Sequence, residues 1–196
     1  MYVLAQMIKS PYIIFYNHSE NANLFNDIEL KEENILFFHA VTKQFLKKSE
    51  LETLSIEPLI DYNIPKLWLK EDSSSRMIKV WENTPDEIEY ISLGENGAKL
   101  IDKNILNLDS FTLSQSQKDK ISKSNFTKNI DGYLNEYELT SVEIYPNLNE
   151  RLLLCKKFNK NVDPAKDILF NEKLPLEYKT YVKIVSGKFP LADLGY

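Results

Sequence analysis

Apolar and polar residues alternate with a strand-like period at the start of the chain. Residues 3–8 and 12–16 are rich in aliphatic and aromatic side chains. The dipeptide Ser10-Pro11 between them is typical of a turn, because proline sets the backbone angle that a turn needs. The pattern therefore predicts two short strands joined by a tight connection.

The spacing of the apolar residues becomes helical further along the chain. Ile35, Phe38, Thr42 and Phe45 follow one another at intervals of three or four positions. Acidic residues precede this stretch and lysines end it, which suits the dipole of a helix. We predict a long helix at about 28–48.

Strand-like patterns return after residue 64. The segments 66–71, 76–82 and 87–94 are rich in β-branched and aromatic residues, and polar turn residues separate them. A helix starting at Thr84-Pro85 is an alternative for the third segment, but the alternation through 87–91 favours a strand. The sequence thus predicts an antiparallel central meander at about 64–101, with Trp68 and Trp81 on adjacent strands.

The last third of the chain contains one predicted hairpin and one predicted helix. Residues 136–145 and 151–158 resemble two strands around a Pro-Asn-Leu-Asn turn, so we predict a hairpin at about 136–158. Pro175 and Gly187 are residues that favour the first turn and the end of a helix, so a C-terminal helix is expected at about 175–186. Because the strands cluster rather than alternate with helices, the expected fold class is α+β with antiparallel sheet.

The length of 196 residues is sufficient for one α+β domain that covers residues 1–196. The polar stretch 107–132 is poor in aromatic residues, and it is the place where we expect a weak subdivision.

Composition and charge exclude several classes of function. The net charge is −5, and only two of the 24 basic residues are arginines, Arg76 and Arg151. This argues against nucleic-acid binding, which depends on clustered cations. No apolar run approaches the ~20 residues that cross a bilayer, so no membrane association is expected. A single cysteine cannot form an internal disulfide, which favours a cytoplasmic location.

The residues of common catalytic and metal sites are scarce. His18 and His39 are the only histidines, and each is expected to be structural or solvated, because no further ligands accompany it. Cys155 ends an apolar run and is expected to be buried. No glycine-rich phosphate loop is present. We therefore predict no cofactor, no metal and no catalytic residue, although a carboxylate enzyme would leave no such linear motif.

Acidic residues are concentrated in two stretches without basic residues. One stretch contains Glu50, Glu52, Glu57 and Asp61. The other lies between Lys79 and Lys99, and its residues predicted to bind a partner are Trp81, Glu82, Asp86, Glu87, Glu89 and Tyr90. Acids around exposed aromatics favour fast and specific capture of a basic protein. The alternative interpretation is a solvated sheet edge that its charges protect from aggregation.

These observations favour a non-enzymatic intracellular binding protein that engages a basic protein partner. Inhibitors, immunity or antitoxin-like proteins and adaptors are of this kind. An enzyme that uses carboxylates without a linear motif is one alternative. A structural subunit of a phage or secretion assembly is another, and it predicts large exposed apolar patches.

Overall fold

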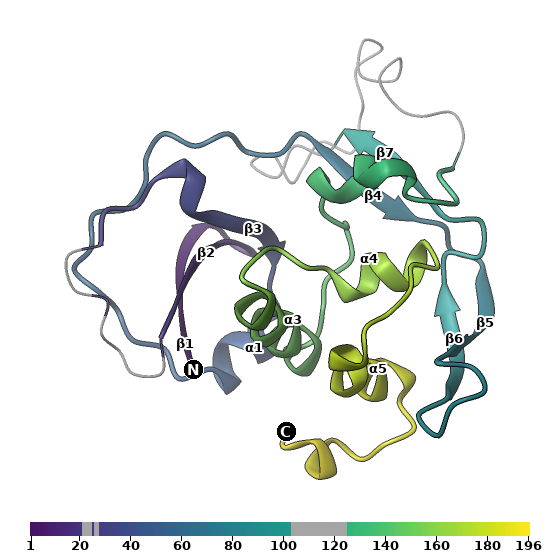
Figure 1. Cartoon of the computed structure of the whole chain (residues 1–196). Helices are drawn as coiled ribbons and strands as arrows, with labels where there is room; N and C mark the ends of the chain where they lie inside the picture. Colours follow the sequence, from purple (N-terminus) through teal and green to yellow (C-terminus); the bar gives the residue numbers. More distant parts are fainter. Residues whose placement is uncertain (21–24, 26–27, 103–124) are drawn as a thin grey trace.

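The computed structural model describes residues 1–20, 25, 28–102 and 125–196, and it combines antiparallel strands with short helices (Figure 1). The strands are β1 (Tyr2–Lys9), β2 (Tyr12–Glu20), β3 (Ile35–Ala40), β4 (Leu67–Glu71), β5 (Ser75–Val80), β6 (Ile88–Leu93) and β7 (Ala98–Asp102). The α-helices are α1 (Lys43–Lys48), α3 (Tyr145–Phe158), α4 (Pro164–Leu169) and α5 (Lys179–Ser186). Short 3-10 turns are η1 (Glu32–Asn34), η2 (Ile130–Glu136), η3 (Leu176–Tyr178) and η4 (Leu191–Leu194). The α+β class is thereby confirmed.

The first sheet has the order β1-β2-β3, and all its strands are antiparallel. The two strands predicted around Ser10-Pro11 are β1 and β2, so that prediction is confirmed. Successive side chains of β2 point to opposite faces, and both faces are buried. Ile13 and Phe15 face the main core, whereas Ile14 and Tyr16 belong to a second cluster that the segment 54–64 covers.

The long helix predicted at about 28–48 is wrong. Residues 35–40 form strand β3, and apart from the 3-10 turn η1 only the six residues of α1, which begins after Thr42, are helical. The hydroxyl of Thr42 caps α1 by accepting a hydrogen bond from Phe45 N at 3.0 Å. The apolar run of β3 is continuous because the strand is covered on both faces, with Phe37 and Phe38 in different clusters. A short continuous run fits such a strand as well as it fits a helix.

The strands expected between 64 and 101 are present, but their predicted meander connectivity is wrong. β4 pairs with β7 and β5 pairs with β6, so the β5–β6 hairpin (residues 75–93) is inserted between two paired strands. Trp68 and Trp81 therefore do not lie on adjacent strands. The connection before β7 turns at Gly97, where φ is +80° and a Cβ atom would lie 1.9 Å from the carbonyl oxygen of Phe126.

The hairpin predicted at about 136–158 is also wrong, because residues 145–158 form helix α3. Pro146, which we interpreted as a turn residue, lies in the first turn of the helix, where its missing N–H is not needed. Leu148, Leu152 and Cys155 have helical spacing and are buried on one side. Asn159 ends the helix in the left-handed conformation, with φ of 52°.

The C-terminal helix predicted at about 175–186 is confirmed by η3 and α5. The helix ends at Gly187, as expected, with φ of 63°. Residues 103–124 lie outside the described residues, so the subdivision predicted at 107–132 falls mostly there, and the single-domain organisation stays a prediction.

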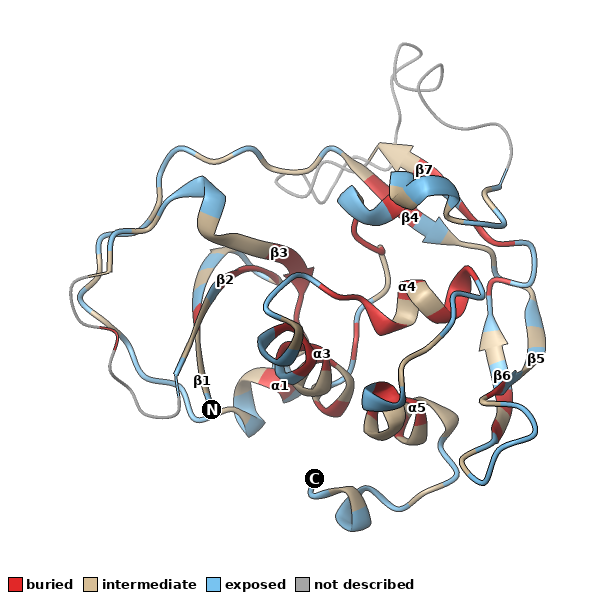
Figure 2. Cartoon of the chain, viewed as in Figure 1, coloured by how far each residue is buried: buried red, intermediate tan, exposed pale blue. Residues whose placement is uncertain are grey.

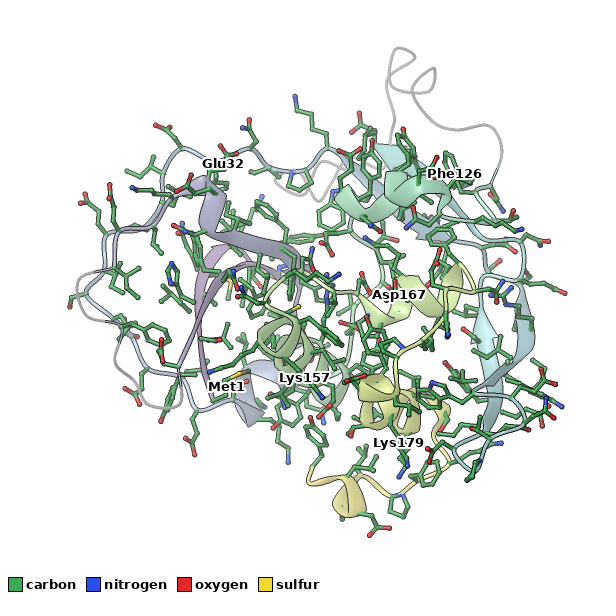
Figure 3. All side chains as sticks on the ribbon, viewed as in Figure 1. Met1, Glu32, Phe126, Lys157, Asp167 and Lys179 are labelled. Atoms are coloured by element: carbon green, nitrogen blue, oxygen red, sulfur yellow. The ribbon has the colours of Figure 1, made fainter. Side chains whose placement is uncertain are left out.

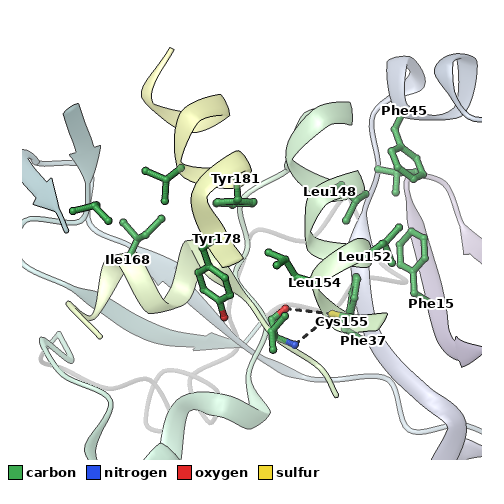
Figure 4. Packing of buried hydrophobic residues seen from close by; sticks show 14 of the residues in the cluster. Phe15, Phe37, Phe45, Leu148, Leu152, Leu154, Cys155, Ile168, Tyr178 and Tyr181 are labelled. Atoms are coloured by element: carbon green, nitrogen blue, oxygen red, sulfur yellow. Dashed lines mark hydrogen bonds between the residues drawn. The ribbon is translucent and has the colours of Figure 1, made fainter. Parts of the chain in front are cut away.

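The main core lies between the first sheet and the β5–β6 hairpin, and α3 and α5 pack between them. Figure 4 shows Leu148 and Leu152 of α3 directed towards the aromatic rings of the first sheet, while Tyr181 of α5 lies on the opposite side of α3. The β5–β6 hairpin closes the core beyond α5 with Val80 and Ile88 (Figure 1). Buried residues are concentrated along this central region, and the hairpin lies at the margin of the molecule (Figure 2).

Candidate functional site

The β5–β6 hairpin has one buried face and one outer face. The register pairs Met77 with Ile91 and Ser75 with Leu93, so alternate residues of both strands share a face. The outer face consists of Ser75, Met77, Lys79, Glu89, Ile91 and Leu93. Met77, Ile91 and Leu93 are exposed by 57%, 67% and 50%. These three side chains form a small apolar patch that no described residue of the chain covers.

The two aromatic residues predicted to bind a partner are not both on the surface. Tyr90 is buried in the main core, on the inner face of the hairpin. Burial raises the pKa of its phenol, and its hydroxyl has no hydrogen-bond partner among the described residues. Trp81 is half-buried in a left-handed conformation, and its Nε1 donates to the carbonyl oxygen of Leu174 at 3.0 Å. Tyr90 therefore supports the hairpin rather than contacting a partner.

The four predicted acidic residues lie together at the hairpin, but they differ in their partners. Asp86 pairs with Lys179 of α5, which Figure 3 labels beside the hairpin. Glu89 lies 3.8 Å from Lys79 on the opposite strand. Glu87 accepts a hydrogen bond from Asn83 N at 2.7 Å, which leaves its net charge uncompensated.

Glu82 is exposed and has no ion pair or hydrogen bond with a described residue. The uncompensated charge of this hairpin end therefore comes from Glu82 and Glu87. Both residues are exposed, and they lie next to the end of the hairpin where the Lys79–Glu89 pair borders the apolar patch.

The apolar part of this surface was not predicted from the sequence. The alternation of residues along β5 and β6 contained a signal for this patch. Met77 and Ile91 lie opposite each other, on the face of the hairpin that also carries polar residues such as Lys79. The strand pattern alone does not say which face is buried, since both faces carry apolar residues.

A second cluster of charged residues lies in the interior around Arg151 of α3. Its side chain is 1% exposed, and Cζ of its guanidinium lies 3.8 Å from the centroid of the Phe37 ring. Nη2 lies 2.8 Å from Oε2 of Glu138, and Nη1 lies 3.4 Å from Oδ2 of Asp163. The Nε group donates to the carbonyl oxygen of Val162 at 3.0 Å. A guanidinium is suited to this role because its donors form a fixed planar fork.

Glu143 extends the cluster towards the first sheet and α5. Its Oε2 lies 3.8 Å from His39 Nε2, and its Oε1 accepts a hydrogen bond from Tyr181 at 2.5 Å. Burial raises the pKa of Glu143 to about 7, although the nearby Arg151 lowers it. Burial also acts to raise the pKa of Asp163, but Arg151 and Lys166 outweigh it and hold this pKa below its usual value.

The Arg151 cluster joins elements that are distant in the sequence. Asp163 caps α4 by accepting a hydrogen bond from Lys166 N at 3.1 Å, while Arg151 belongs to α3. Two hollows lie elsewhere in the described part of the molecule, and none of the charged residues of the cluster lines either of them. The cluster therefore positions α3, α4 and the first sheet relative to one another. It contributes no charged side chain to a substrate site in either hollow.

No spacing in the sequence predicts the Arg151 cluster, but the scarcity of arginine is a signal that each of the two arginines has a specific role. Both arginines of the chain make several directed contacts. Arg76 Nη2 donates to the carbonyl oxygens of Leu169 and Ile168, at 3.0 and 3.4 Å, at the end of α4. In a chain whose other cations are lysines, an arginine marks a position that needs a planar donor.

The remaining candidate groups do not form a reactive site in the described part of the chain. His39 is buried in β3 beside Glu143, whereas His18 lies in β2. Cys155 is buried with its sulfur 3.5 Å from the carbonyl oxygen of Val162, and burial raises the pKa of its thiol. Residues 1–20, 25, 28–102 and 125–196 contain no group of three or more potential ligands that could hold a metal ion.

Comparison with known families gives one match. Residues 1–174 match the model of a family described as "Domain of unknown function (DUF8309)". The chain belongs to this family. The matched residues include the first sheet, the β5–β6 hairpin, α3 and α4, whereas η3, α5 and η4 follow the match. Comparisons with curated proteins and with solved structures gave no significant match.

Within the described ranges, no helix combines the length and the apolar character that crossing a bilayer requires.

Proposed function

We propose that the protein is a non-enzymatic, cytoplasmic binding protein, of the inhibitor, immunity or adaptor kind, that engages a basic protein through the β5–β6 hairpin. The observation that carries this proposal is the exposed apolar patch of Met77, Ile91 and Leu93. Exposed apolar side chains are unfavourable in water, and burying them against a partner surface lowers the free energy.

The charges beside the patch support a basic partner. Glu82 and Glu87 are exposed at the tip of the hairpin, and Glu95 is exposed just beyond its other end. An apolar centre with charged residues at its margins is the usual anatomy of a protein interface. Acidic residues at the rim raise the association rate constant with a positively charged surface more than they lower the dissociation rate constant.

The experiment that tests this proposal captures a partner from the native host. The tagged full-length protein is incubated with host lysate and eluted with stepped salt, and the eluate is identified by mass spectrometry. We expect one stoichiometric, basic protein that is released at moderate salt. The double variant Met77→Ser/Ile91→Ser should lose this protein, because both side chains project from the outer face.

The matched control is Ile130→Ser, which removes an equally exposed apolar side chain outside the hairpin; Ile130 is 70% exposed. Capture supports the proposal only if the hairpin variant loses the protein and the control retains it. Equal capture by both variants, or no specific partner for the wild type, would overturn it.

A further inference from the structure

The outer edge of β1 is open to pairing. β1 is an edge strand of the first sheet, and its backbone pairs with β2 on one side only. On the other side, residues 2–8 make no backbone–backbone hydrogen bond with any described residue. Such an edge presents a row of donors and acceptors that an added strand can satisfy.

A groove of about 690 Å³ runs along this edge. All residues from Met1 to Met7 line it, although successive side chains of a strand point to opposite faces. The lining also includes Ile13 and Phe45 of the main core and Leu4 and Phe25 of the second cluster, so the hollow reaches both faces of the sheet along the edge of β1. The opposite wall is formed by residues 48–54, and the floor includes Phe45 of α1 and Tyr145 and Leu152 of α3. Figure 3 labels Met1 at the start of this groove.

The segment around Leu59 contacts β1 through the side chain of Gln6, on the face of the sheet that carries Ile14 and Tyr16. Gln6 Nε2 donates to the carbonyl oxygen of Leu59 at 2.9 Å, and Leu59 N donates to Gln6 Oε1 at 3.0 Å. A glutamine amide offers the same donor and acceptor as a backbone peptide group. The backbone of Leu59 is thereby satisfied by a side chain, and it makes no backbone–backbone hydrogen bond with described residues of β1.

Acidic side chains lie along the rim of the groove. Among the side chains that line it, Glu50 and Glu52 are acidic and Lys48 is basic. A second hollow of about 520 Å³ shares Leu30 and Pro58 with the groove, and its charged lining residues are all acidic: Glu29, Glu57 and Asp61. Lys31 lies 3.3 Å from Glu29 and compensates one of these charges. The exposed carboxylates of Glu50, Glu57 and Asp61 favour a positively charged occupant.

We propose that the edge of β1 and this groove bind an extended segment of a partner protein that carries lysine or arginine residues. The segment adds to the sheet as a fourth strand. Its backbone pairs with β1, its apolar side chains fill the groove and its cations face the acidic rim. β1 has eight residues, so it accommodates a segment of about the same length. This surface is separate from the hairpin, and the proposal stands whether or not the hairpin binds a protein.

The test selects peptides from a displayed library of random twelve-residue sequences against the whole protein. We expect the selected peptides to be enriched in lysine and arginine alternating with apolar residues. Their dissociation constants should rise at least ~tenfold for the variant Glu50→Lys/Leu51→Ser, because both side chains line the groove and are exposed. The control Met77→Ser/Ile91→Ser should bind the same peptides as the wild type.

Amide hydrogen exchange locates the bound peptide. The proposal predicts that exchange of residues 2–8 slows on binding, because an added strand protects the free edge of β1. Selection of no peptides, selection of acidic peptides, or protection confined to the hairpin would overturn the proposal. Sedimentation of the free protein provides a further check, since a dimer whose contact protects residues 2–8 would show that a second copy occupies the edge instead.

Discussion

Arg151 Nη2 lies 2.8 Å from Oε2 of Glu138, and both side chains are almost fully withdrawn from solvent. Taking two charges out of water is costly, and their attraction repays the cost only when the remaining donors and acceptors are satisfied. Here Asn161 contacts both partners, since its Oδ1 accepts from Arg151 at 3.1 Å and its Nδ2 donates to Glu138 at 3.1 Å. The pair therefore depends on a complete set of neighbours.

Replacing Arg151 by methionine should strongly destabilise the fold, because two or more buried acids lose their counter-ion. We expect the free energy of unfolding to fall by ~3–5 kcal/mol, measured by urea denaturation. The control is Lys157→Met on the same helix, which removes an exposed ion pair with Glu177 and should cost less than ~1 kcal/mol. A loss for Arg151→Met as small as that of the control would contradict the role assigned to the cluster.

The stability of the protein should fall as pH rises through the neutral range, and Glu143 should be a cause. Burial raises the pKa of Glu143 to about 7, whereas a glutamate in an unfolded chain titrates near ~4.3. Between these values the folded protein binds more protons than the unfolded chain. The stabilising contribution is therefore complete below about pH 4.3 and is lost as pH rises through the folded pKa.

The variant Glu143→Gln isolates this effect, because glutamine does not titrate. The free energy of unfolding of the wild type, relative to this variant, should decrease by on the order of 2 kcal/mol between about pH 5 and pH 8. Arg151 and Tyr181 favour the charged form, and Asp163 and Glu138 oppose it. A difference that stays constant with pH would show that Glu143 is ionised throughout.

Two tyrosines of the main core should respond oppositely to loss of their hydroxyl groups. The hydroxyl of Tyr90 is buried without a hydrogen-bond partner among the described residues, so Tyr90→Phe should leave stability unchanged or raise it by up to ~1 kcal/mol. The hydroxyl of Tyr181 donates to Glu143, so Tyr181→Phe should cost ~1–2 kcal/mol. Thermal or urea unfolding of both variants measures the contrast, and equal losses would be inconsistent with these hydrogen-bond assignments.

The sequence predicted the strands better than it predicted the helices, for a physical reason. β1, β2 and the β5–β6 hairpin are bounded by turn residues, and local chemistry fixes such boundaries. Helix α3 was misread because its buried side carries Arg151 among Leu148 and Leu152, which interrupts the apolar stripe that marks a helix. The charge of Arg151 is compatible with burial only through residues that are distant in the sequence.

In the candidate site too, the local sequence predicted some features, while packing between distant elements decided others. The acids of the hairpin were predicted from their concentration in the sequence, and the structure places them on one hairpin. The burial of Tyr90 and the exposure of Met77 depend on which face of the hairpin meets α5. That choice is made by packing between elements, which strand periodicity does not specify.

The most direct test of the proposed function is the salt dependence of association with the captured partner, measured by stopped-flow or surface plasmon resonance. For Glu82→Ser/Glu87→Ser, we expect a lower association rate constant at low salt and a flatter dependence on ionic strength than for the wild type. The control Glu20→Ser/Glu33→Ser changes the net charge equally on the first-sheet side of the molecule and should keep most of the wild-type dependence. If the hairpin variant and its control associate equally fast at every salt concentration, the hairpin is not the surface that attracts the partner.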